Sequence, residues 1–331
     1  MKGDNNTDYS NDQNYDISKT EVKPTKIDGI AGKIYSINIE FRASDGLRWN
    51  YNVDTSKFDI KYSQNLKSDQ ITIKTEAGPK KGQLVIFVTQ TKVTTDTPNI
   101  LSFKYNGENI LTTVSLNIKC AQLDHLTFIE GPSKGNVINP PQIIFEPRDA
   151  YENLYTDLFS SSTTQDEINS LTVGNSLEKV TLTSNNSLSD KKLIVQYLSK
   201  ISTNVVVTSE YFENSYNYRI YSGPISEEVS YAEIVSETNE VGGEYILLIT
   251  PKDIYSNNVD GLNANSVKQF NVIYKTVGGK DEVKVTDCKL TNNNFNIECT
   301  AKITKAGNMQ FIVKYVNNVI SCKNQCRFSV I

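Results

Sequence analysis

Cysteine thiols are the groups of this chain best placed for covalent chemistry. The chain has 5 cysteines, and four of them gather in its last third: Cys288, Cys299, Cys322 and Cys326. An even number grouped in one region favours two disulfides. We favour Cys288–Cys299 and Cys322–Cys326, because a turn at Asn293-Asn294 would place Cys288 opposite Cys299. That register is out of phase with the preceding strand residues and therefore predicts a bulge near Thr286.

Three other states of these cysteines stay open. Cys299 and Cys326 could bond to each other instead, because both fall at inward-facing positions. The four thiolates could bind zinc, although the first pair is spaced more widely than the two to four residues typical of such sites. All four could remain reduced in a cytosolic protein. Cys120 is the odd one, either free or bonded to a group outside the sequence.

The sequence does not supply a catalytic constellation. His125 is the single histidine, and nucleophilic triads and histidine metal sites need partners that are not apparent. No phosphate-binding loop or dinucleotide-binding glycine motif occurs. The 38 acidic residues are scattered along polar faces. We therefore expect no enzyme activity, no cofactor and no metal.

Net charge and hydropathy restrict the classes of partner and the cellular location that we expect. The net charge of −4 is spread along the chain, without the basic stripe that nucleic-acid binding requires. Apolar runs are strand-sized, and the start carries no signal peptide. We expect a fragment of a larger protein, attached to a membrane only through segments outside it. Glycosylation sequons at Asn5 and Asn185, together with the cysteine cluster, favour an extracellular location.

One phrase occurs twice, about 100 residues apart, which is the length of one small β-sandwich. It comprises Asp149, Tyr151 and Asn153, and then Asp253, Tyr255 and Asn257. A looser copy surrounds Asp45. A short carboxylate can bond its own backbone two residues on, and a tyrosine hydroxyl can hold a neighbouring loop. We interpret the phrase as a structural turn, since a cadherin-like calcium site needs more closely spaced carboxylates.

The remaining sequence predicts only strands. Apolar residues alternate with polar ones, as in Phe295 to Ile303, and Asn106-Gly107 is a strong hairpin signal. The fold class is therefore all-β, with three tandem immunoglobulin-like β-sandwiches. We expect a partly disordered polar tail over 1–25, whose end supplies a first strand. The modules are predicted at 26–120, 121–224 and 225–331, the last one carrying the cysteine cluster.

These features resemble the filamin repeat. The resemblance rests on the Asp-Tyr-x-Asn phrase, the polar stretch after it and the closing hairpin, and it covers residues 26–331. In filamins the phrase usually ends Gly-Asn, whereas here Glu152 and Ser256 precede the asparagine. Partners of filamins often add a strand to an exposed sheet edge. The resemblance implies such an edge at 268–274, with Phe270, Val272 and Tyr274 as contact candidates.

The resemblance also implies function. Filamin-like repeats occur in gamete-surface adhesion proteins of plants and protists, so we expect a non-enzymatic cell-surface adhesion or recognition segment. Its partner would be a protein, either a receptor or a like molecule on another cell. The alternative is an intracellular actin-crosslinking rod, which redox state distinguishes because disulfides persist outside the cytosol. A lectin-like glycan binder lacks a recognisable site.

Overall fold

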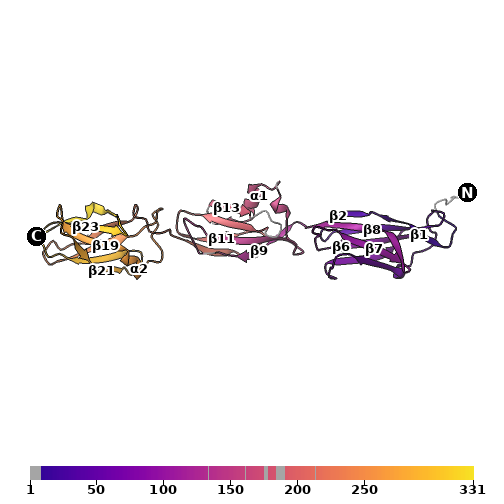
Figure 1. The fold of residues 1–331 in the computed structure, drawn as a ribbon, viewed down its shortest axis with the longest axis horizontal. Coiled ribbons are helices and arrows are strands. Elements are labelled where there is room, and N and C mark those ends of the chain that lie inside the picture. Colours follow the sequence, from indigo (N-terminus) through magenta and orange to yellow (C-terminus); the bar gives the residue numbers. More distant parts are fainter. Residues whose placement is uncertain (1–8, 133, 161, 175–177, 184–190, 213) are drawn as a thin grey trace. The chain divides into compact units, whose positions relative to one another are not determined.

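The computed structural model describes residues 9–132, 134–160, 162–174, 178–183, 191–212 and 214–331 (Figure 1). Short strands dominate, and the α-helices are α1, Gln165–Ser170, and α2, Ala264–Lys268. The predicted all-β class of immunoglobulin-like sandwiches is therefore confirmed. Among these residues no helix is long and apolar enough to cross a membrane.

The first pair of sheets lies between residues 15 and 119. One sheet has the order β1-β3-β6-β5: Tyr15–Lys23, Ile34–Ala43, Gln83–Gln90 and Ile71–Ala77. The other has the order β2-β8-β7-β4: Lys26–Ile30, Glu108–Lys119, Asn99–Tyr105 and Phe58–Tyr62. Alternate residues such as Ile37 and Ile39 face a shared core. The predicted hairpin is confirmed, since Asn106 (φ 51°) and Gly107 (φ 86°) join β7 to β8.

The second pair of sheets lies between residues 123 and 221. One sheet has the order β10-β16-β15-β12: Gly135–Asn136, Tyr216–Tyr221, Thr203–Thr208 and Val173–Gly174. The other has the order β13-β14-β11-β9: Glu178–Thr183, Leu193–Leu198, Gln142–Asp149 and Leu123–Glu130. Phe145 and Tyr197 are fully buried here. The predicted polar stretch contains a 3-10 turn, η2 (Asp157–Phe159), and α1, whose start Thr164 caps with its side chain.

The third pair of sheets lies between residues 231 and 330. One sheet has the order β21-β22-β18-β17-β25: Asp287–Leu290, Ile297–Lys302, Glu244–Thr250, Tyr231–Ser236 and Ser321–Cys322. The other has the order β20-β19-β23-β24: Val283–Val285, Phe270–Thr276, Gly307–Tyr315 and Asn318–Val319. After η3 (Lys323–Cys326), β26 (Arg327–Val330) also pairs with β23. Figure 1 shows β19 and β23 side by side in this part of the chain.

The predicted register of the cysteine-bearing strands is confirmed, but the predicted bulge is wrong. Cys288 lies opposite Cys299, and Leu290 lies opposite Ile297. Thr286 separates β20 from β21, which belong to different sheets. The change of phase therefore arises because the chain passes from one sheet to the other, and no extra residue enters a ladder.

Internal contacts divide the chain into two compact units. The first combines the residues up to Thr127 with Glu146–Thr163, and the second combines Phe128–Phe145 with Leu193–Ile331 as its main parts. Strand pairing instead follows three successive stretches of sequence. The end of the predicted tail forms β1, as expected.

Candidate functional site

The repeated phrase folds into the same turn at both places. The amide of Asp149 donates to the carbonyl of Asn153 at 2.9 Å, and the amide of Asp253 donates to that of Asn257 at 3.0 Å. Glu152 (φ 63°) and Ser256 (φ 66°) occupy the left-handed region. Glycine adopts this conformation without strain. Both turns therefore hold a backbone conformation that favours glycine, although neither residue is a glycine.

A buried carboxylate organises each turn. Oδ1 of Asp149 accepts the amides of Tyr151 and Asn153, each at 2.9 Å. Oδ1 of Asp253 accepts the equivalent amides of the second turn, also at 2.9 Å. Both aspartates have a relative exposure of 0%. Backbone N–H donors thus replace the water that each buried charge has lost.

The first turn also bonds to loops that precede it by many residues. Oδ2 of Asp149 accepts the amide of Ala121 at 2.8 Å. Nδ2 of Asn153 donates to the carbonyl of Thr91 at 2.7 Å, and its Oδ1 accepts the amide of Val93 at 3.2 Å. These five residues are called the first clamp below. They all lie within one compact unit.

The second turn repeats this set of bonds. Oδ2 of Asp253 accepts the amide of Gly223 at 2.8 Å. Nδ2 of Asn257 donates to the carbonyl of Lys200 at 2.8 Å, and its Oδ1 accepts the amide of Ser202 at 3.1 Å. These five residues are called the second clamp. Sequence reasoning missed the six loop residues of the two clamps because they take part through backbone atoms, which any residue type supplies.

Asp260 reinforces the second clamp. Its Oδ2 accepts the hydroxyl of Ser202 at 2.8 Å and the amide of Ser222 at 3.0 Å, while Oδ1 pairs with Arg219 at 2.9 Å. Burial alone would raise the pKa of the Asp260 carboxyl, but these hydrogen bonds and the guanidinium outweigh it and hold the pKa below its ordinary value. Asp260 therefore binds as a carboxylate at neutral pH.

The tyrosines of the two turns are partly exposed. Tyr151 and Tyr255 each keep 41% of their surface exposed. Tyr151 lies against Gly32, where an added Cβ would fall 1.8 Å from the tyrosine hydroxyl oxygen. The absence of a side chain at Gly32 makes room for that ring. Tyr151 thus adds a surface contact to the first clamp.

The looser copy around Asp45 also forms the turn, but with a shift of two residues. Here the amide of Ala43 donates to the carbonyl of Leu47 at 2.9 Å, and Gly46 has φ 82°. Ala43 therefore stands where Asp149 stands, and Asp45 caps the amide of Leu47. The sequence comparison placed Asp45 at the position of Asp149, so it did not reveal this shift of two residues. Neither a clamp aspartate nor a clamp asparagine is present in this turn.

The cysteines are bonded as Cys288–Cys299 and Cys322–Cys326. The rival Cys299–Cys326 bond does not form. Cys120 is a buried free thiol whose Sγ lies 3.8 Å from Oγ1 of Thr156. Across the described ranges no three metal-binding side chains gather in one place.

The predicted partner edge is wrong. β19 carries Phe270, Val272 and Tyr274, yet it lies between β20 and β23. β20 covers Val272 to Tyr274, and the three aromatic and aliphatic side chains are buried. The sequence did not indicate that β20 covers this edge, because β20 is only three residues long. A partner strand cannot add there without displacing β20.

His125 and the sequons complete the predicted positions. His125 is half-buried, with Nδ1 2.9 Å from Asp124 and Nε2 3.4 Å from Glu152. These contacts lie at the surface and join the imidazole to two carboxylates. The sequons at Asn5 and Asn185 lie outside the described residues.

The comparisons with known proteins concern the fold. No protein-family model and no curated protein matches the chain. FdeC, an adhesin of Escherichia coli, matches with a TM-score of 0.53 and 12% identity over 96% of this chain and 98% of its own. Invasin, a bacterial integrin-binding protein, matches with a TM-score of 0.45 and 12% identity over 94% and 59%. The Lin-41 filamin domain matches with a TM-score of 0.23 and 12% identity over 31% and 96%. At such identities, the likeness to FdeC shows a shared fold alone.

Proposed function

We propose that the chain is a non-enzymatic segment of a cell-surface adhesion or recognition protein. In this proposal three filamin-type modules, 26–120, 121–224 and 225–331, follow one another. The observation that carries it is the pair of clamps, in which one set of side chains makes one set of bonds at both predicted junctions. A catalytic site needs to occur only once in a chain. A segment that holds modules in a row needs the same contact at each junction between modules.

Each clamp should restrict the motion of one module relative to the next. Neighbouring domains move relative to each other by default unless their interface is large or specifically bonded. Each clamp supplies three hydrogen bonds from two side chains to backbone atoms of the preceding stretch. In each turn the aspartate also accepts two hydrogen bonds from backbone amides of the same turn, and these bonds hold its carboxylate in position. We therefore expect a restricted hinge at each junction.

Location and partner follow from the same proposal. Two disulfides suit an oxidising, extracellular setting, and Asn5 and Asn185 would then be open to glycosylation. The partner would be a protein on another cell, and the gamete-adhesion role is the most specific form of the proposal. The likeness of fold to an adhesin supports this function.

The test is binding of protein-coated beads to cells of the organism that makes the protein. Beads carrying the chain should bind such cells, and an excess of soluble chain should release them. Failure to bind, together with co-sedimentation of the chain with actin filaments, would overturn the proposal in favour of the intracellular rod. Intact-mass measurement with and without reductant should show four added hydrogens, two for each bond opened.

A further inference from the structure

The two disulfides of the third pair of sheets lie in different backbone settings. Cys288–Cys299 joins β21 to β22, where the two cysteines are directly opposite each other; it is called the ladder bond below. Cys322–Cys326 closes the short turn η3 across a sequence separation of 4 and is called the turn bond. In each bond one cysteine is partly exposed, Cys288 or Cys322, and the other is buried. Exposure therefore does not distinguish the two bonds, whereas their surroundings do.

The backbone around the turn bond favours its open form. Gln325 (φ 56°) and Cys326 (φ 45°) follow one another in η3, and both occupy the left-handed region. This conformation costs free energy for residues other than glycine, and opening the bond lets both residues return to ordinary backbone angles. The ladder bond lies between paired strands instead. When it opens, β21 and β22 still hold its two thiols opposite each other, which favours closure of the bond again.

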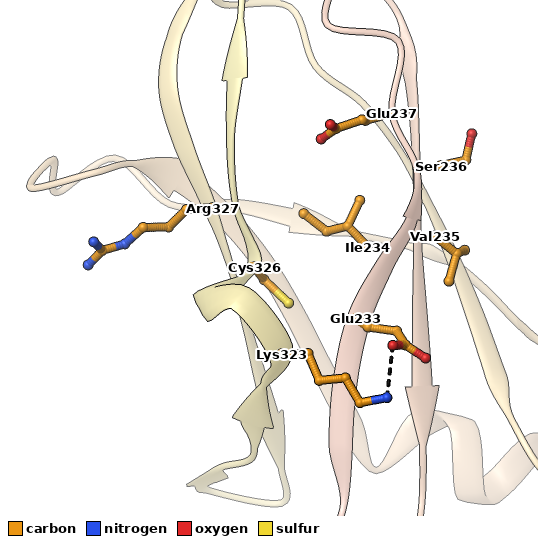
Figure 2. Close-up of a pocket in the computed structure, with 8 residues that line it drawn as sticks. All are labelled: Glu233, Ile234, Val235, Ser236, Glu237, Lys323, Cys326 and Arg327. Carbon is orange, nitrogen blue, oxygen red and sulfur yellow. Dashed lines mark hydrogen bonds and ion pairs between the residues drawn. The ribbon is translucent and has the colours of Figure 1, made fainter.

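A hydrogen-bond acceptor is in place for the thiol that opening of the turn bond releases. Sγ of Cys326 lies 3.8 Å from the carbonyl oxygen of Ala232 on β17. A disulfide sulfur has no hydrogen to donate, whereas a thiol can donate to that carbonyl. Cys326 also borders a groove of about 590 Å³, and Figure 2 shows its sulfur directed into this groove toward β17. The reduced form thus gains a hydrogen bond that the oxidised form lacks.

We propose that the turn bond is a redox switch, which a dithiol reductant opens while the ladder bond stays closed. One thiolate of the dithiol attacks Sγ of Cys322, the partly exposed cysteine. The S–S bond breaks, and Cys326 leaves as a thiolate and takes up a proton from water. The second thiol of the dithiol then displaces Cys322 from the mixed disulfide, so the dithiol is oxidised by two electrons and both cysteines end as thiols. This inference goes beyond the proposed function and does not rest on it.

Opening the turn bond loosens one edge of the third pair of sheets without dismantling it. β25, which precedes η3, is paired with β17 only at Tyr231 and Ala232. A strand this short depends on the turn that follows it, so it loosens together with η3. β26 stays paired with β23, and that ladder does not include the bonded cysteines. Amide exchange at 321–326 should therefore rise about tenfold on reduction, while exchange of β23 stays unchanged.

The test equilibrates the full chain, without denaturant, with a series of ratios of reduced to oxidised dithiothreitol. Thiols are blocked with N-ethylmaleimide and located by peptide mass spectrometry. The turn bond should open at a ratio about tenfold lower than the ladder bond. Gln325→Gly should raise the ratio that opens the turn bond by about fivefold, because glycine adopts a positive φ without strain and so stabilises the closed turn. Gln325→Ala, the matched control, keeps the strained conformation and should leave that ratio unchanged.

Several results would overturn the inference. Two of them concern the order of opening: both bonds opening at the same ratio, or the ladder bond opening first. Equal effects of Gln325→Gly and Gln325→Ala would show that the left-handed backbone does not drive the opening. Hydrogen exchange at 321–326 that does not rise in the reduced chain would show that the bond controls no motion. A rise that extends over β23 would mean that the whole pair of sheets unfolds, which is not a switch.

Discussion

Asn153→Ala is the sharpest test of the first clamp. The change removes the Nδ2 bond to the Thr91 carbonyl at 2.7 Å and the Oδ1 bond from the Val93 amide at 3.2 Å. It leaves the backbone amide of residue 153, which still donates to Asp149. The turn should therefore persist while its hold on the loop 91–93 is lost.

The expected magnitude follows from these two bonds. One intramolecular hydrogen bond contributes about 0.5–1.5 kcal/mol net to stability. Loss of the two bonds should therefore lower the local free energy of opening by roughly 1–3 kcal/mol. Thr91 and Val93 are half-buried, and water can replace part of what is lost. Since 1.4 kcal/mol corresponds to a factor of ten, amide exchange of Val93 should accelerate by about ten- to a hundredfold.

The assay is residue-resolved hydrogen exchange, because a chain of several units need not unfold in one step. Asn257→Ala is the matched control: it removes the equivalent bonds to Lys200 and Ser202. It should accelerate exchange at Ser202 and leave Val93 unchanged, and Asn153→Ala should do the reverse. Unchanged exchange at Val93 in Asn153→Ala, or the same pattern in both variants, would refute the reasoning.

Three further predictions concern the turns and the disulfides. Ser256→Gly should stabilise the second turn by about 0.5–1 kcal/mol in thermal unfolding, because residue 256 has a positive φ; a lower midpoint would contradict this. Asp260→Asn should lower the midpoint at pH 7, and the difference from the parent should shrink as the pH falls below about 4. The sign follows because the folded pKa of Asp260 is below its ordinary value of 3.8, so its stabilisation is present above that value and lost on protonation. Replacing Cys288 and Cys299 together with serine should cost about 2–3 kcal/mol, measured as a lower denaturation midpoint, and no change would contradict a stabilising bond.

Much of the fold could be predicted from local patterns. Alternation identified strand β22. Asn106-Gly107 marked its hairpin, because both residue types readily adopt a positive φ. The register between Cys288 and Cys299 followed from the turn expected at Asn293-Asn294, which is also a local signal. The passage between sheets at Thr286 could not be predicted, since a bulge and a change of sheet produce the same shift of parity.

The candidate site was predictable only in part. Asp149 and Asp253 bond their own turns within four residues, and the residue types indicated this. Their bonds to Ala121 and Gly223 depend on the tertiary structure and use backbone amides, so no residue type in the sequence indicates them. The edge at Val272 was wrong for a similar reason, because a three-residue strand such as β20 carries too few residues for a periodic signal.

Parallel pairing between an early strand and a late strand of the same pair of sheets has a mechanical consequence. In the first pair of sheets, five residues of β2 pair in parallel with β8, Lys26–Ile30 against Ser115–Lys119. In the third, only Tyr231 and Ala232 pair in parallel with β25. Tension that pulls two parallel strands apart along their axes loads all of their bonds in shear at once, instead of opening them one by one. The first pair of sheets should therefore withstand a larger pulling force than the third before it yields.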